Sequence, residues 1–161
     1  MKNFFQKLFG SSKSTNNVDE DLIVFQNTFS FDQKVAMICT MFGIANFGGK
    51  VSEMESRYIN HTARFLGVSM NDPKFISTAS KYKGDKYKTD IFLIDSLISM
   101  KDKSYYITTV HGLILCSEDS EEKKEDKLAY AMRLCKRIGI SEEQYVNRIE
   151  MDSQLRKAFL G

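Results

Sequence analysis

Residues 48–55, "GGKVSEME", join two stretches of helical periodicity and decide how the chain folds. Ser52 and Glu55 match a capping box, in which the serine hydroxyl and the glutamate carboxylate each accept a hydrogen bond from an otherwise unpaired backbone amide. Gly48 and Gly49 precede the box and suit a tight turn, because glycine adopts conformations that other residues avoid. The stretch therefore predicts that one helix ends before Gly48 and that a second helix begins after Ser52.

The same signals recur along the rest of the chain. Ser30 with Gln33 and Ser141 with Gln144 are two more capping boxes, and the dipeptide Asp-Pro at 72–73 is typical of a helix start. Apolar residues follow each start at helical spacing, and no segment alternates as a half-buried strand does. The sequence predicts an all-α bundle of about seven helices, which begin near residues 31, 53, 73, 90, 104, 122 and 142.

Length and composition indicate one soluble domain. The chain has 161 residues, of which 42% are hydrophobic and 27% are charged, as in ordinary globular proteins. Its net charge of +2 is too small to favour nucleic acid as a partner. No apolar run approaches the roughly 18 residues of a membrane span, and the N-terminus lacks the features of a signal peptide. Three cysteines without a Cys-x-x-Cys spacing are typical of buried thiols in a reducing cytoplasm.

The N-terminal region differs from the rest in composition. Residues 11–21 have the composition of a flexible linker, and residues 22–161 contain the helical patterns. Residues 1–10 hold a cluster of large apolar side chains: Phe4, Phe5, Leu8 and Phe9. Such a cluster ahead of a linker predicts a short segment that docks on a partner protein. Contact with a membrane surface and packing against the chain's own bundle are the alternatives.

The helical region contains an internal repeat. Gly67 and Gly139 stand 72 residues apart, and Leu-Gly-Val-Ser at 66–69 corresponds to Ile-Gly-Ile-Ser at 138–141. Apolar positions farther upstream correspond at the same offset. Helical periodicity alone would align apolar residues, but it would not produce the shared Gly-x-Ser sequence. We therefore expect two related halves, each with a helix, a loop and a second helix.

Two motifs and an acidic stretch carry a family resemblance: Gly-Lys-Val-Ser-x-x-Glu at 49–55, Leu-Gly-Val-Ser at 66–69, and residues 116–125 as a second copy. Together they resemble the TerB-like family, over residues 30–150. That family is linked to tellurite resistance and also occurs in membrane-anchored DnaJ-like co-chaperones. The resemblance implies a helical fold, a role in stress response and acidic loops that hold divalent cations. The family's loop aspartate should stand where this chain has Gly48, which leaves only Glu53 and Glu55 near the first loop.

The acidic stretch at residues 118–127 is the main candidate for a cation site. The resemblance implies that this stretch holds a divalent cation through Glu118, Asp119, Glu121, Glu122 and Glu125. Glu53 and Glu55, near the first loop, are weaker candidate ligands. Hard cations such as Ca²⁺ need several converging oxygen ligands. However, the spacing is not that of an EF-hand, and three lysines, including Lys127, neutralise part of the charge. The helix dipole also favours carboxylates in any first turn. A metal- or partner-binding loop and a solvated helix start therefore both stay open.

Motifs of catalysis are missing from the sequence. It has no phosphate-binding loop, Gly-x-Ser-x-Gly or His-Glu-x-x-His, and His111 is expected to have a hydrogen-bond partner or to be half-buried. Lysines and tyrosines at 81–88 suit nucleic acid, but the small net charge favours a soluble loop. We predict a non-enzymatic, cytoplasmic module that binds a protein partner, with contact to the membrane surface as an option. The alternative is a divalent-cation sensor built on residues 118–125.

Overall fold

The part of the chain that the structure describes is entirely helical. The computed structural model describes residues 29–82 and 100–160, and it contains no strand within them. Its six helices are α3 (Phe31–Ala45), α4 (Glu53–Phe65), α5 (Pro73–Ser80), α7 (Met100–Cys116), α8 (Glu121–Arg137) and α9 (Glu142–Leu160). None of these six is long and apolar enough to span a membrane. The predicted all-α class is confirmed, whereas the helix expected near residue 90 and the segments 1–10 and 11–21 lie outside the described residues.

Most of these helices begin at the caps that the sequence predicts. The hydroxyls of Ser30, Ser52 and Ser141 each accept a hydrogen bond from the backbone amide three residues later, and each capping box is complete. A carboxylate oxygen of Asp72 accepts a hydrogen bond from the amide of Lys74 at 2.9 Å and so begins α5. These bonds satisfy amides that a helix cannot pair internally.

Two glycines end helices in the same way. Gly67 follows α4 with φ +76°, and Gly139 follows α8 with φ +89°. After Gly67, the amide of Val68 donates a hydrogen bond of 2.9 Å back to the carbonyl of Ala63. After Gly139, the amide of Ile140 donates one of 2.8 Å to the carbonyl of Cys135. This is the Schellman arrangement, which favours glycine because other residues are strained at positive φ.

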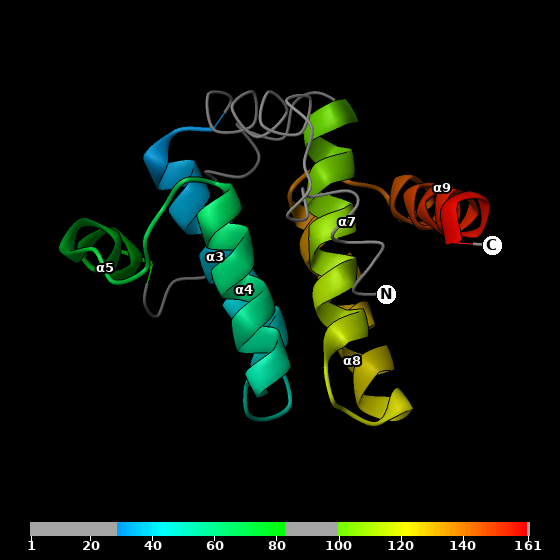
Figure 1. The fold of residues 1–161 in the computed structure, drawn as a ribbon, viewed down its shortest axis with the longest axis horizontal. Helices are drawn as coiled ribbons and strands as arrows, with labels where there is room; N and C mark the ends of the chain where they lie inside the picture. Colours follow the sequence, from blue (N-terminus) through cyan, green and yellow to red (C-terminus); the bar gives the residue numbers. More distant parts are fainter. Residues whose placement is uncertain (1–28, 83–99, 161) are drawn as a thin grey trace.

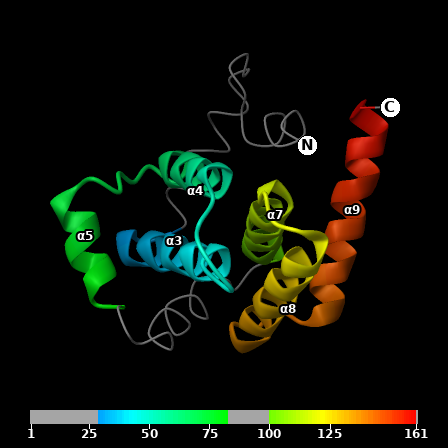
Figure 2. The same cartoon turned by 90° about the horizontal axis from the view of Figure 1, so that it is seen from below.

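Helices α3 and α7 occupy the middle of the bundle. Helix α4 packs against both of them, and α8 likewise packs against α7 and α3. Helix α5 packs against α3 at one edge, and α9 packs against α7 and α8 at the opposite edge (Figure 2). The connection from α3 to α4 and the connection from α7 to α8 lie at the same end of the bundle, the lower end in Figure 1.

Apolar side chains from the two central helices fill the core. Met37, Ile38, Met41 and Ile44 of α3 are completely buried, and each such side chain stabilises the fold by about 1.5–3 kcal/mol relative to an exposed one. Val35 and Ala36 are also completely buried and point to other sides of the helix, so α3 is covered on most sides. The central helices are also joined by a hydrogen bond of 2.9 Å between the hydroxyls of Thr40 and Tyr106.

Candidate functional site

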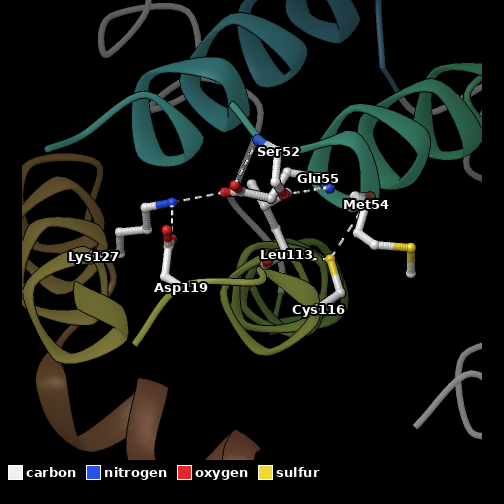
Figure 3. A network of polar contacts seen from close by, with 7 residues as sticks. All are labelled: Ser52, Met54, Glu55, Leu113, Cys116, Asp119 and Lys127. Atoms are coloured by element: carbon white, nitrogen blue, oxygen red, sulfur yellow. Dashed lines mark hydrogen bonds and ion pairs between the residues drawn. The ribbon is translucent and has the colours of Figure 1, made fainter. Parts of the chain in front are cut away.

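A buried lysine joins the two interhelical connections at one end of the bundle. Lys127 of α8 extends toward the first turn of α4, where its Nζ donates a hydrogen bond of 2.9 Å to Oε2 of Glu55. The same Nζ forms an ion pair with Oδ2 of Asp119, which precedes α8. Figure 3 shows these three side chains, which we call the Lys127 network.

Glu55 has two structural roles at once. Its Oε1 accepts a hydrogen bond from the backbone amide of Ser52 at 3.1 Å, which completes the capping box of α4. Its Oε2 is the atom that binds Lys127. The cap therefore holds one carboxylate oxygen in place and leaves the other directed toward α8. Glu55 is completely buried and Lys127 is only 2% exposed, so the glutamate of this capping box lies inside the protein, while Ser52 is half-buried.

The charges of the network depend on one another. The hydrogen bond from Lys127 holds the pKa of the Asp119 carboxyl below its usual value. Burial by itself lowers the pKa of Lys127, but the hydrogen bonds to Asp119 and Glu55 outweigh burial and raise that pKa above the usual lysine value. Lys127 therefore carries its charge at neutral pH. A buried charge is stable only when it is paired in this way.

The structure brings together only two of the predicted metal ligands. Asp119 and Glu55 both bind Lys127, while Glu53 pairs on the surface with Arg57 at 2.7 Å. The remaining predicted ligands are exposed to solvent: Glu118, Glu121, Glu122 and Glu125. Within residues 29–82 and 100–160, no group of three or more histidine, cysteine, aspartate or glutamate side chains is arranged to hold a metal ion. The residues present do not fit the divalent cation that the resemblance implies, because the converging carboxylates already bind an ammonium group.

The sequence carries a signal for Lys127 that the charge pattern of α8 obscures. Lys127 stands four and seven residues before Ala131 and Leu134, which are both buried on α8, so it belongs to the apolar face of that helix. Glu55 stands four residues before the buried Ile59 on α4. A lysine and a glutamate on apolar faces are expected to pair with each other, because neither is normally buried alone.

The other predicted binding segments are described only in part. The predicted partner-binding residues lie outside the described residues: Phe4, Phe5, Leu8 and Phe9. From the lysine- and tyrosine-rich stretch 81–88, the structure describes Lys81 and Tyr82. Tyr82 is buried, and its hydroxyl donates a hydrogen bond of 3.4 Å to the backbone oxygen of Asp32. This ring is therefore not exposed for stacking on a nucleic-acid base.

A second polar cluster, which sequence patterns do not reveal, joins α9 to α7. Asp152 accepts a hydrogen bond of 2.7 Å from the hydroxyl of Thr108 and pairs with Arg148 at 2.8 Å. Nearby, Nδ1 of His111 lies 3.0 Å from the hydroxyl oxygen of Tyr145, and the residue is half-buried, so the expectation of a hydrogen-bonded or half-buried histidine is confirmed. Burial lowers the pKa of His111 to about 4. The imidazole is therefore uncharged at neutral pH and engaged in holding two helices together.

All three cysteines have free thiols. Cys135 is buried as expected, whereas Cys39 and Cys116 are only half-buried. Burial raises the pKa of Cys39 to about 11 and the pKa values of Cys116 and Cys135 to about 12. Because the thiolate is the reactive form of cysteine, these side chains are poor nucleophiles at neutral pH.

Comparisons with known proteins do not assign the chain to a family. No protein-family model matches its sequence, and no curated protein and no solved structure is significantly similar to it. The resemblance to the TerB-like family therefore rests on the sequence motifs.

Proposed function

We propose that this protein is a non-enzymatic, TerB-like helical module that binds a protein partner, as an adaptor or stress-response protein. The buried titratable groups support a non-catalytic role, because those described above are engaged in holding helices together. Lys127 binds two carboxylates, and His111 contacts Tyr145. The observation that carries the proposal is the apolar surface of α9.

Helix α9 presents large apolar side chains to solvent. Met151 is 52% exposed and Phe159 is 67% exposed, and the half-buried Leu155 lies between them. A spacing of four residues places the three side chains along one side of a helix, which we call the α9 stripe (Met151, Leu155 and Phe159). Soluble proteins rarely expose such side chains in a contiguous group without a binding role.

The charges around the α9 stripe indicate the chemistry of the partner. Arg156 and Lys157 stand between Leu155 and Phe159 in the sequence, and Lys157 is exposed. A protein segment that combines apolar side chains with an acidic one would therefore match this surface. The apolar cluster of residues 1–10 is the second element that we propose contacts the partner.

The packing of the bundle supports the proposed duplication and, through it, kinship with the TerB-like family. Helix α5 lies on α3 as α9 lies on α7, and α4 contacts α7 as α8 contacts α3. The two Schellman ends, at Gly67 and Gly139, are 72 residues apart. Glu55 and Lys127 are also separated by 72 residues. Contact between corresponding residues is expected where two halves meet across a twofold axis.

The proposal is tested by recovering partners with the full chain and with three variants. Met151→Glu places a charge in the α9 stripe, deletion of residues 1–10 removes the apolar cluster, and Gln154→Glu is the matched control, because Gln154 is a polar, exposed residue of the same helix. We expect one protein to be lost with Met151→Glu and retained with Gln154→Glu. That recovered partner, once purified, should bind the wild-type chain directly.

Other outcomes separate the alternatives. If no protein partner is recovered, and the chain binds anionic lipid vesicles in a way that Met151→Glu abolishes, the α9 stripe binds a membrane surface and not a protein. An unchanged set of recovered proteins in all variants, with helicity intact, would refute the proposal. The divalent-cation sensor stays a prediction with less support, because Asp119 and Glu55 are bound by Lys127.

A further inference from the structure

We propose that Glu55 and Asp119 form a cation site that the chain occupies with its own Lys127 ammonium, in place of an exchangeable metal ion. This site does not depend on partner binding or on the α9 stripe. It holds the two interhelical connections together, and an alkylammonium ion would bind to it if Lys127 were removed.

The geometry of the carboxylates carries the inference. Glu55 comes from α4 and Asp119 from the loop before α8, yet both direct an oxygen at the same Nζ. The amide of Ser52 fixes the position of the Glu55 carboxylate independently of Lys127. The side chain of Asp119 is 18% exposed, whereas that of Glu55 is fully buried. The site is therefore preformed on the α4 side and reaches solvent at Asp119.

The bound ammonium excludes a divalent ion. Ca²⁺ takes six to eight oxygen ligands, whereas in the described part of the chain two carboxylates, those of Glu55 and Asp119, converge on Nζ. An ion entering beside Nζ would also meet a positive charge in a buried region, where repulsion is weakly screened. The exposed glutamates of α8 point to solvent and do not complete the site. A tethered ammonium satisfies both carboxylates without depending on the concentration of any ion.

Removal of the lysine side chain should leave a site for a primary alkylammonium ion. Alanine keeps only the Cβ of the four-carbon lysine stem, so n-propylammonium matches the atoms that Lys127→Ala removes. The buried carboxylate of Glu55 and the half-buried carboxylate of Asp119 would then lose their cation, and an unpaired buried charge strongly destabilises a protein. An exogenous cation that binds the folded state should restore part of that stability.

Chemical rescue in thermal unfolding tests the proposal. We expect n-propylammonium to raise the Tm of Lys127→Ala saturably, by about 3–5 °C at ten times its Kd. Tetramethylammonium at equal ionic strength, which has no N–H donor, should not reproduce the rise. The wild type and Lys124→Ala should not respond, since Lys124 pairs only loosely with the exposed Glu121 at 3.9 Å. Lys127→Ala/Asp119→Asn should respond less than Lys127→Ala. Equal responses in all variants, or no response in folded Lys127→Ala, would overturn the inference.

A measurement on the wild type keeps the proposal testable if Lys127→Ala does not fold. A buried, hydrogen-bonded ammonium exchanges its protons slowly, so the side-chain ¹⁵N resonance of Lys127 should be observable by NMR at neutral pH. We expect this resonance to stay unchanged in millimolar Mg²⁺, Ca²⁺ or Zn²⁺. Its loss or displacement on adding one of these ions would mean that an exchangeable metal competes for the site, and the inference would fail.

Discussion

Replacement of Glu55 by glutamine measures how much the Lys127 network stabilises the fold. Glutamine keeps the shape of the side chain and an oxygen that accepts the Ser52 amide, but it removes the charge that Lys127 binds at 2.9 Å. Removing one partner of a buried ion pair costs about 3–5 kcal/mol. Because Asp119 still pairs with Lys127, we expect the lower end, about 3 kcal/mol. For a chain of this size, that loss lowers the Tm by roughly 6–12 °C.

Urea unfolding followed by far-UV circular dichroism gives this free energy. Glu53→Gln is the matched control: Glu53 pairs with Arg57 on the same helix, but their side chains are 74% and 70% exposed, and such pairs contribute less than about 1 kcal/mol. The double variant Glu55→Gln/Lys127→Met removes both charges, and it should be more stable than the sum of the single variants by at least about 1 kcal/mol. A loss below about 1 kcal/mol for Glu55→Gln, together with additive effects, would refute the reasoning.

Three further predictions concern protonation, backbone conformation and thiol reactivity. The pKa of His111 is about 4 in the folded protein and about 6.5 in an unfolded chain, so the unfolded state binds more protons between these values. Stability should therefore fall as the pH decreases from about 6.5 to about 4, and thermal unfolding of His111→Gln should show a smaller fall. Gly48→Ala should destabilise by about 1–2 kcal/mol because Gly48 has φ +80°. Gly49→Ala should stay within about 0.5 kcal/mol in the same urea assay, because Gly49 lacks a positive φ and an added Cβ would meet nothing within 4 Å. A disulfide reagent should label the folded protein slowly and the unfolded protein fast at all three thiols, and rapid labelling of the folded state would contradict the raised pKa values of Cys39, Cys116 and Cys135.

Local hydrogen bonds explain why the helix boundaries are predictable. The capping boxes at Ser30, Ser52 and Ser141 pair residues only three positions apart, so the sequence pattern contains the whole interaction. The glycine at each Schellman end is equally local, because its backbone conformation sets the bond between Val68 and Ala63, or between Ile140 and Cys135. The described part of α7 already includes Met100, four residues before the expected start at residue 104.

The candidate site is predictable only in part, because charge patterns do not show which charges become buried. The acidic composition of residues 118–125 indicates a cation site, but it does not distinguish Asp119, which binds Lys127, from its exposed neighbours. Glu55 looks from its sequence like an ordinary surface cap, yet it is fully buried. The position of each charge on the apolar face of its helix is the one local clue to burial.

The sequence by itself determined the helical class, the caps and the glycine ends, because these depend on interactions between residues within a few positions of one another. Only the tertiary structure decided that Lys127 meets Glu55 from 72 residues away and that its ammonium lies between two carboxylates. That choice depends on how α4, α7 and α8 pack, because packing removes water from the charges and so determines which of them must pair.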